Sequence, residues 1–274
     1  MNKLSIEKRA QVVGCLVEGM SIRSTVRITG AAKNTVTKLV VELGAACAEY
    51  QDKALRDLPC KRVECDEIWS FCYAKEKNVP QDLKGQLGYG DIYTWTALCA
   101  DTKLIASFMV GKRDAEYGNA FMLDLASRLK NRIQLTTDGH KVYLNAVENA
   151  FGHDIDYAML IKVYGKATKD DERKYSPVEC TGTEIVTITG DPEEKHISTS
   201  YVERQNLTMR MSMRRFTRPT NGFSKKIENH FFATALYFMY YNFGRIHKTL
   251  RVTPAMEAGI SDHVWTLEEI AGLV

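Results

Sequence analysis

The apolar positions of the first fifty residues recur with helical spacing and predict three short helices. A face of apolar residues between 5 and 18 predicts the first helix, with Ser5 as its cap and Gly19 as its stop. The second is expected over 21–28, and the third over 31–43 after the turn at Thr29 and Gly30. A short helix, a glycine-containing turn and a further helix are typical of a helix-turn-helix. We therefore assign residues 1–50 to such a domain and 51–60 to a linker.

The third predicted helix begins with small polar and basic side chains. In a helix-turn-helix, these first residues contact base edges and phosphates in the major groove. The candidate DNA contacts are Lys33, Asn34, Thr35, Thr37 and Lys38. A helical module used only for dimerisation would show the same pattern, so that alternative stays open.

From residue 61 onward the pattern alternates between strand-like and helix-like segments. Apolar, β-rich runs and helical periodicities follow in the order strand 62–73, strand 93–100, strand 104–110, helix 114–130, strand 133–136, helix 139–151 and strand 155–163. Three strands in a meander followed by α/β crossovers predict a mixed sheet with helices on its faces. The fold class expected is α/β, with the first strand in the centre of the sheet and the domain spanning 61–250.

The remaining segments are less regular. Residues 165–199 are polar and predict an insertion that contains a small hairpin. A helix is expected from Ser200, and an aromatic-rich core helix over 226–243. The tail, 251–274, should end in a short helix that begins near Trp265.

Composition excludes several classes of protein. The seven cysteines include no C-x-x-C pair, which argues against a disulfide framework or a zinc ribbon and favours reduced thiols. The N-terminus is charged and lacks the apolar segment of a secretory leader. The longest apolar run is too short to span a bilayer. We expect a cytoplasmic protein that does not bind membranes.

An acid in the first strand is the most unusual feature of the chain. Asp66 lies among apolar residues, where a carboxylate is costly unless it is paired or bound to a cation. Asp138 follows the fourth strand, where α/β sheets place their ligands. Glu203 lies near the start of the helix after 200. We expect Asp66, Asp138 and Glu203 to hold a divalent metal, whereas Glu67, on the opposite face of the strand, is expected to be structural.

Two of these acids have simpler interpretations. Asp138 could cap the helix that begins at Gly139. Glu203 stands three residues after Ser200, and this spacing is also that of a capping box, in which the glutamate reaches back to the cap backbone.

The net charge of +3 is too small to indicate nucleic acid, but the charge is unevenly distributed. Residues 204–226 carry seven basic side chains and no acid, which favours contact with a phosphate backbone. The candidate DNA contacts in this run are Arg204, Arg210, Arg214, Arg215, Arg218, Lys225 and Lys226.

Over roughly residues 20–250 the chain resembles bacterial insertion-sequence transposases of the DDE class, most closely the insertion-sequence-one family. The resemblance rests on DEIW at 66–69, TDGHKVY at 137–143, YVERQNLTMR at 201–210 and GFSK at 222–225. It implies a ribonuclease-H-like fold, with Asp66, Asp138 and Glu203 as a catalytic triad that binds Mg²⁺ or Mn²⁺. Two departures stand out: no zinc-binding cysteine cluster precedes the first helices, and Glu203 lies 65 positions (203 − 138) after Asp138.

The resemblance implies cleavage and strand transfer at the ends of a mobile element. Its partners would be double-stranded DNA, at the terminal repeats and the target, and further copies of the chain, in the nucleoid. Three other readings remain open: a non-catalytic DNA-binding protein such as a repressor or domesticated transposase, a metal-dependent nuclease without strand transfer, and, more distantly, a two-carboxylate glycosidase.

Overall fold

The structure is a computed structural model that describes residues 4–165, 180–217 and 220–274. Arg218, one of the predicted DNA contacts, and most of the first half of the predicted insertion lie outside the described residues.

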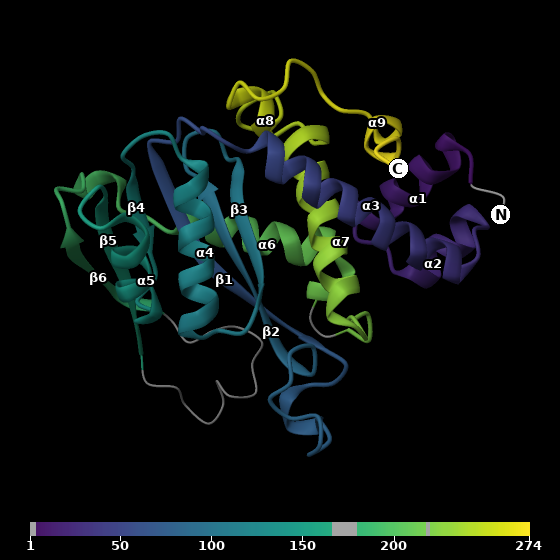
Figure 1. Cartoon of the computed structure of the whole chain (residues 1–274), viewed down its shortest axis with the longest axis horizontal. Helices are drawn as coiled ribbons and strands as arrows, with labels where there is room; N and C mark the ends of the chain where they lie inside the picture. Colours follow the sequence, from purple (N-terminus) through teal and green to yellow (C-terminus); the bar gives the residue numbers. More distant parts are fainter. Residues whose placement is uncertain (1–3, 166–179, 218–219) are drawn as a thin grey trace.

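A six-stranded mixed sheet forms the body of the protein (Figure 1). The strands lie in the order β3-β2-β1-β4-β5-β6. Antiparallel pairing joins β1 to β2, β2 to β3 and β5 to β6, whereas β4 is parallel to both β1 and β5. The bounds are β1 Arg62–Cys72, β2 Gly90–Cys99, β3 Ile105–Gly111, β4 Gln134–Thr137, β5 Asp156–Tyr164 and β6 Cys180–Thr189. The predicted mixed sheet and the internal position of its first strand are confirmed.

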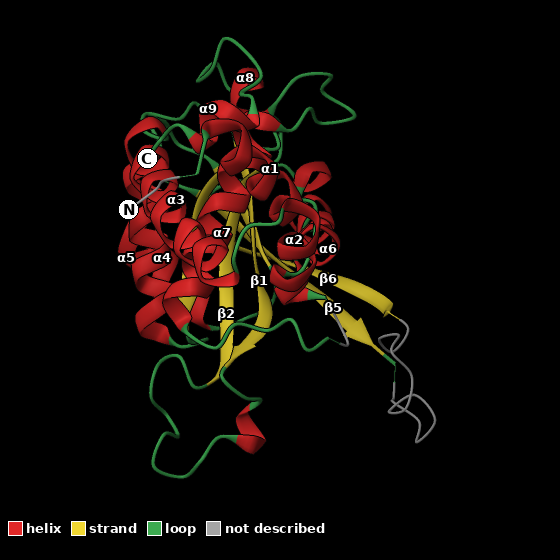
Figure 2. Ribbon diagram, turned by 90° about the vertical axis from the view of Figure 1, so that its right-hand side faces the viewer, coloured by secondary structure: helices red, strands yellow, loops and turns green. Residues whose placement is uncertain are grey.

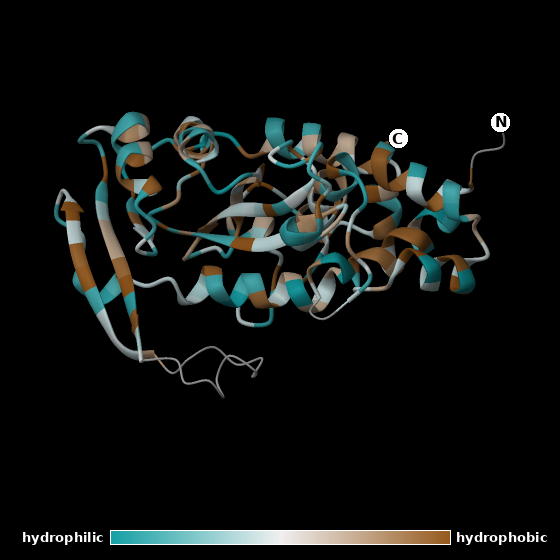
Figure 3. Cartoon of the chain, turned by 90° about the horizontal axis from the view of Figure 1, so that it is seen from below, coloured by the Kyte–Doolittle hydropathy of each residue, from teal (hydrophilic) through white to brown (hydrophobic). Residues whose placement is uncertain are grey.

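The segment predicted as a hairpin within an insertion has a different structure. β6 pairs along the length of β5 and forms the sixth strand of the main sheet. The sequence predicted a small hairpin in this segment but did not indicate the pairing with β5, because one strand's pattern does not specify which edge it will join. Seen from below, β5 and β6 project from one end of the molecule, opposite the N-terminal helices (Figure 3).

Helices cover both faces of the sheet. α4, Ala115–Arg128, and α5, Val142–Phe151, pack together on one face, and α6, Ser200–Ser212, crosses β1 and β2 on the other (Figure 1). Asp114 caps α4 as predicted, because its carboxylate accepts the Tyr117 N–H at 3.1 Å. Buried aromatic and aliphatic side chains then fill the space between the helices and the strands.

The N-terminal helices are α1, Ile6–Val17, α2, Ile22–Thr29, and α3, Lys33–Ala54. Ser5 and Ser21 cap the first two as predicted. α3 is much longer than the predicted third helix and continues through the expected boundary at residue 50. It packs along α7, Ile227–Met239, and a methyl group at Gly44 would lie 2.3 Å from the Phe232 carbonyl oxygen. The close approach of these helices therefore requires glycine.

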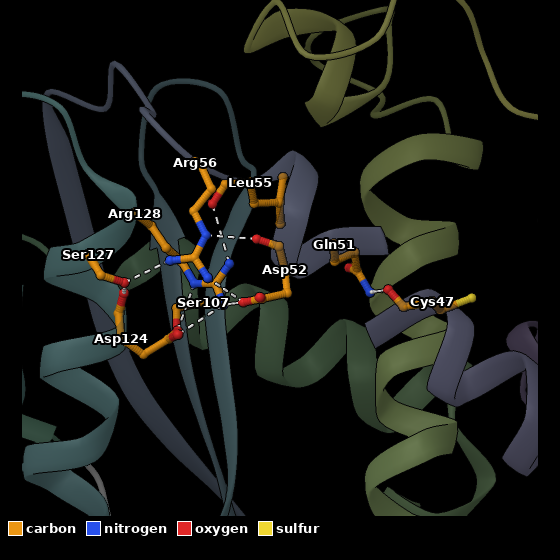
Figure 4. A network of polar contacts seen from close by, with 9 residues as sticks. All are labelled: Cys47, Gln51, Asp52, Leu55, Arg56, Ser107, Asp124, Ser127 and Arg128. Carbon is orange, nitrogen blue, oxygen red and sulfur yellow. Dashed lines mark hydrogen bonds and ion pairs between the residues drawn. The ribbon is translucent and has the colours of Figure 1, made fainter. Parts of the chain in front are cut away.

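A polar network centred on the buried Arg128 joins the end of α3 to α4 and β3 (Figure 4). The Arg128 guanidinium donates to Asp52 at 2.8 Å and to both oxygens of Asp124 at 2.7 and 2.9 Å. Ser107 on β3 donates to Asp124 as well, at 2.5 Å. The N-terminal helices are thus fixed to the sheet by charge pairs in addition to apolar packing.

The C-terminal segment returns to the N-terminal helices. α9, Leu267–Ala271, packs on α1 and begins with a capping box between Thr266 and Glu269, which confirms the predicted closing helix. Both chain ends lie at this end of the molecule (Figures 1 and 2). The shorter elements are one-turn 3₁₀ helices at Glu76–Asn78, Glu194–His196 and Arg214–Phe216, a π-turn at Tyr240–Gly244, and α8, Pro254–Glu257. Within the described residues, no helix combines the length and the apolar character needed to cross a bilayer.

Candidate metal centre and nucleic-acid interface

Strand register brings the first two predicted acids together. β4 is parallel to β1, and Cys65 lies opposite Thr137. The next residue on each strand is an acid, so Asp66 and Asp138 meet where β4 ends. Ligand oxygens of Asp66, Glu67 and Asp138 all lie within 4.8 Å of one another.

Asp66 points toward α6 and is largely buried. Its Oδ2 accepts a hydrogen bond from Asn206 Nδ2 at 2.7 Å, and its Oδ1 accepts the Glu67 N–H at 2.8 Å. Burial raises the pKa of Asp66 to about 6, and the charge of Asp138 acts in the same direction. A cation placed between the two carboxylates would offset both the burial of the charged form and the repulsion between the two charges.

Glu67 also reaches this cluster, which the sequence did not indicate. Its side chain leaves the opposite face of β1, as predicted, and is only 1% exposed. Burial raises its pKa to about 7, with the Tyr143 hydroxyl acting in the opposite direction. Pairing with β4 stops at Cys65, so β1 has a free edge at Asp66 and Glu67. Their carboxylates leave opposite faces of the sheet and approach one another around this edge.

Arg113 is the cation already present at the cluster. It lies between β3 and α4, with its Nη2 3.1 Å from Glu67 Oε2 and 3.6 Å from Asp138 Oδ2. No pattern in the sequence identified this residue, since its contacts depend on how the loop before α4 folds over the end of β4.

Asp138 does not cap α5. That helix begins at Val142 with Lys141 in the cap position, whereas Asp138 Oδ1 accepts the His140 N–H at 3.0 Å in a local turn. Its second oxygen faces Arg113, so the carboxylate is turned toward the cluster and away from the helix.

Glu203 lies on α6 near Asp66, and its charge contributes to the raised pKa of Asp66. It does not belong to the close group of three. Lys162 on β5 holds both of its oxygens at 2.5 Å, and the Thr199 hydroxyl donates to it at 2.6 Å. The capping box that its spacing allowed does not form, because the Ser200 N–H donates to Ser198.

The N-terminus of α6 is capped by Glu64 instead. Glu64 Oε2 accepts the N–H groups of Tyr201 and Val202 at 2.8 and 3.0 Å. By the two-residue period of a strand, Glu64 lies on the same face of β1 as Asp66. In the structure it fixes α6 against β1, one pleat from Asp66, and so sets the position of Asn206 and Glu203.

The donor set fits a hard divalent cation. Three carboxylates, two from the middle of β1 and one directly after β4, supply the oxygen ligands that Mg²⁺ prefers. Mg²⁺ takes few carboxylates at a site that keeps room for water and phosphate. Glu67 Oε1 is buried, and no donor of good hydrogen-bond geometry faces it among the described residues. The Tyr143 hydroxyl lowers the pKa of Glu67 without offsetting the effect of burial, and a cation would stabilise the charged carboxylate further.

The predicted DNA contacts of the N-terminal domain lie on one surface. Lys33, Asn34, Thr35 and Lys38 are exposed at the start of α3, and Thr37 is half-buried, with its hydroxyl bonded to the Lys33 carbonyl. Their exposure is compatible with contact to a nucleic acid, although the helix-turn-helix itself stays a prediction.

The basic run divides into exposed and interior members. The exposed side chains are Arg204, Arg214, Lys225 and Lys226, and Arg210 is half-buried. Arg215 turns inward and donates to the Ser224 hydroxyl and the Asn229 carbonyl at 3.0 and 2.5 Å. Burial lowers its pKa to about 10. Arg215 thus supports the local fold, which leaves its neighbours to face solvent.

A cavity of about 810 Å³ connects the two basic regions. Lys33 and Thr37 of α3 line one side, and Arg214 and Lys225 line the other. The start of α3 and the segment after α6 therefore border a common hollow.

No protein-family model matches this chain, and no curated protein matches its sequence.

Proposed function

We propose that the protein is a DDE-class DNA transposase with a ribonuclease-H-like core. The observation that carries the proposal is the β1–β4 register, which puts Asp66 and Asp138 side by side at the end of a parallel strand pair. The strand order β3-β2-β1-β4-β5, with its antiparallel meander and parallel crossovers, is compatible with such a core.

In this proposal Asp66 and Asp138 hold Mg²⁺ or Mn²⁺, and Glu67 closes the cluster from the opposite face. The bound metal would activate a water or a 3′-hydroxyl and stabilise the leaving oxygen of an in-line displacement. Asn206 orients the Asp66 carboxylate through its 2.7 Å hydrogen bond. Glu203 would complete the predicted triad by leaving its ion pair with Lys162 and binding the metal. It lies on α6, about one helical turn before Asn206.

The basic surfaces would hold the DNA. Arg204, Arg214, Lys225 and Lys226 are exposed around the segment after α6 and can neutralise phosphates. The first three helices, as a helix-turn-helix, would recognise the terminal repeats through the exposed start of α3. Because two element ends must be cut together, the active species would be a homodimer or larger.

The test is cleavage of DNA that carries the sequences on either side of the coding region. The chain should nick such duplexes only with Mg²⁺ or Mn²⁺, and should join the released 3′ ends to a target duplex. The substitutions D66N and D138N should each reduce cleavage about a hundred-fold or more while leaving duplex binding intact. E203Q should do the same, because its triad role needs a carboxylate.

The matched control is E268Q, which removes the same charge from an exposed acid on α9, far from the cluster. It should cleave like the unchanged protein. Metal-dependent cleavage that survives D66N would exclude the assignment. Cleavage without joined products would identify a nuclease instead of a transposase.

One observation favours a second candidate, a non-catalytic DNA-binding protein. Arg113 and Lys162 already neutralise Glu67, Asp138 and Glu203 within the fold. A domesticated transposase could use these ion pairs in place of a metal. It would bind the flanking DNA with unchanged affinity in Mg²⁺ and in a chelator, and would release no nicked product.

A further inference from the structure

A second cavity, of about 920 Å³, lies further along β1 from the acidic cluster. It is lined by Trp69 and Phe71 of β1, by the segment that follows the strand, and by a group of residues after α6: Arg214, Arg215, Phe216, Thr217, Thr220, Asn221 and Phe223. β4 pairs with β1 as far as Cys65, and the bridge between Cys72 and Ser224 follows. The part of β1 that lines the cavity therefore lies between its pairing with β4 and its bridge to Ser224, next to the place where Asp138 meets Asp66.

Aromatic rings form one wall of this cavity. The ring centroids of Trp69 and Phe71 lie 5.8 Å apart, and those of Phe71 and Phe223 lie 4.6 Å apart. All three side chains are half-buried, so part of each ring remains accessible. The aromatic residues of the core differ: Tyr237 and Phe238 on α7, for example, are fully buried. The wall is thus an accessible platform of neighbouring rings that are tilted against one another.

The charge around the platform is positive. Lys75, Lys77 and Arg214 line the cavity, and the Lys225 ammonium lies 4.1 Å from the centre of the Phe223 ring. None of the described residues that line the cavity is acidic. Accessible aromatic rings within a basic groove are the combination by which proteins hold single-stranded nucleic acid, with bases stacked on the rings and cations along the backbone.

We propose that this cavity binds unstacked bases of DNA next to the cleavage site. The inference rests on the proposed function only in assuming that the protein handles DNA. Three residues of extended strand separate Asp66 from Trp69, a distance of about 10 Å. A phosphate at the acidic cluster would therefore place a neighbouring nucleotide at the cavity. An intact duplex hides the faces of its bases in the stack, so the occupant is a strand that has been locally unpaired.

The experiment compares two oligomers of equal length and charge without any metal. One is an oligothymidylate, and the other has the same sugar–phosphate backbone with abasic positions throughout. Fluorescence anisotropy should show that the unchanged protein prefers the oligothymidylate. F223L keeps an apolar side chain but removes the stacking surface, and should reduce that preference about five- to hundred-fold. F223W should retain it.

F151L makes the same change to a half-buried phenylalanine at the end of α5, on the other side of the molecule, and should leave the preference unchanged. W69L provides a second variant if F223L does not give a cooperative thermal transition. Equal binding of both oligomers by the unchanged protein would overturn the proposal, as would a full preference in both F223L and W69L. Since binding is read without metal, a preference for bases would stand even if no cleavage were found.

Discussion

Replacing Asp66 with asparagine should make the metal-free protein more stable, even though the proposed function expects the same substitution to abolish cleavage. Burial and the charge of Asp138 raise the pKa of Asp66 from 3.8 to about 6. The folded state thus favours the protonated acid, and ionisation above about pH 6 costs stability. Two pKa units correspond to about 3 kcal/mol. An asparagine is uncharged at every pH and escapes this cost.

The substitution also loses some hydrogen bonding. Asp66 accepts from both Asn206 and the Glu67 N–H, and an asparagine offers only one acceptor oxygen for the two donors. The lost bond costs about 1 kcal/mol. The net gain is then about 2 kcal/mol near pH 8, which raises the melting temperature by about 5 °C for a chain of this size. Below pH 3.8, where Asp66 is protonated in both the folded and unfolded states, the gain should disappear.

Thermal unfolding with a chelator, at pH near 8 and again near 4, measures this difference. Adding Mg²⁺ should then stabilise the unchanged protein more than D66N, because ligand binding to the folded state adds to its stability and the variant has lost a ligand. If D66N is less stable than the unchanged protein at the higher pH, the argument about the buried carboxylate is wrong. If Mg²⁺ stabilises both equally, Asp66 is not a metal ligand.

Three further predictions concern the frame that supports the site. His230 is buried between Ser70 and Ser224, and burial and the nearby Arg215 charge lower its pKa to about 3. The free energy of unfolding should therefore be highest above about pH 6.5 and should fall by about 2 kcal/mol near pH 5. H230N should flatten the pH dependence of the melting temperature. G44A should destabilise the protein by at least about 2 kcal/mol because a methyl group collides with the α7 backbone, whereas G14A meets only the end of a flexible leucine and should be neutral in the same denaturant titration. R128M should cost about 2 kcal/mol, because Asp124 loses its cation whereas Asp52 keeps Arg56. Urea unfolding that shows less than about 1 kcal/mol would mean that the Arg128–Asp124 pair is screened by solvent.

The local pattern of the chain predicted most of the elements correctly. Ser5, Ser21 and Asp114 cap helices at the predicted starts, and five of the six strands correspond to predicted strands, whereas the sixth lies in the segment predicted to contain a small hairpin. These features depend on neighbours a few residues away, whose effects are readable from sequence. Boundaries that depend on distant contacts were harder to place. α3 continues past the expected domain boundary at residue 50 to Ala54, where it still belongs to the helix that packs along α7.

The cap of α6 shows how a local signal can point to the wrong partner. Ser200 and Glu203 have the spacing of a capping box, yet the N–H groups are taken by Glu64 from a strand more than a hundred residues earlier. Glu203 is then free to pair with Lys162. The Glu64 carboxylate is already held by β1 beside the first N–H groups of α6, and its charge is favourable at a helix N-terminus. Glu203 therefore does not need to fold back onto its own helical turn to accept these hydrogen bonds.

The sequence alone identified Asp66 as an acid that needs a partner, because a carboxylate in an apolar strand carries its cost wherever the strand lies. It named Asp138 and Glu203 as the acids expected to join Asp66, but it did not give the geometry by which they would meet. The answer came from the register of β1 with β4, from the point at which β4 stops, and from the loop that brings Arg113 over that edge. Register and loop path follow from the packing of the entire sheet, so only the tertiary structure placed Asp138 beside Asp66 and brought Glu67 into the same cluster.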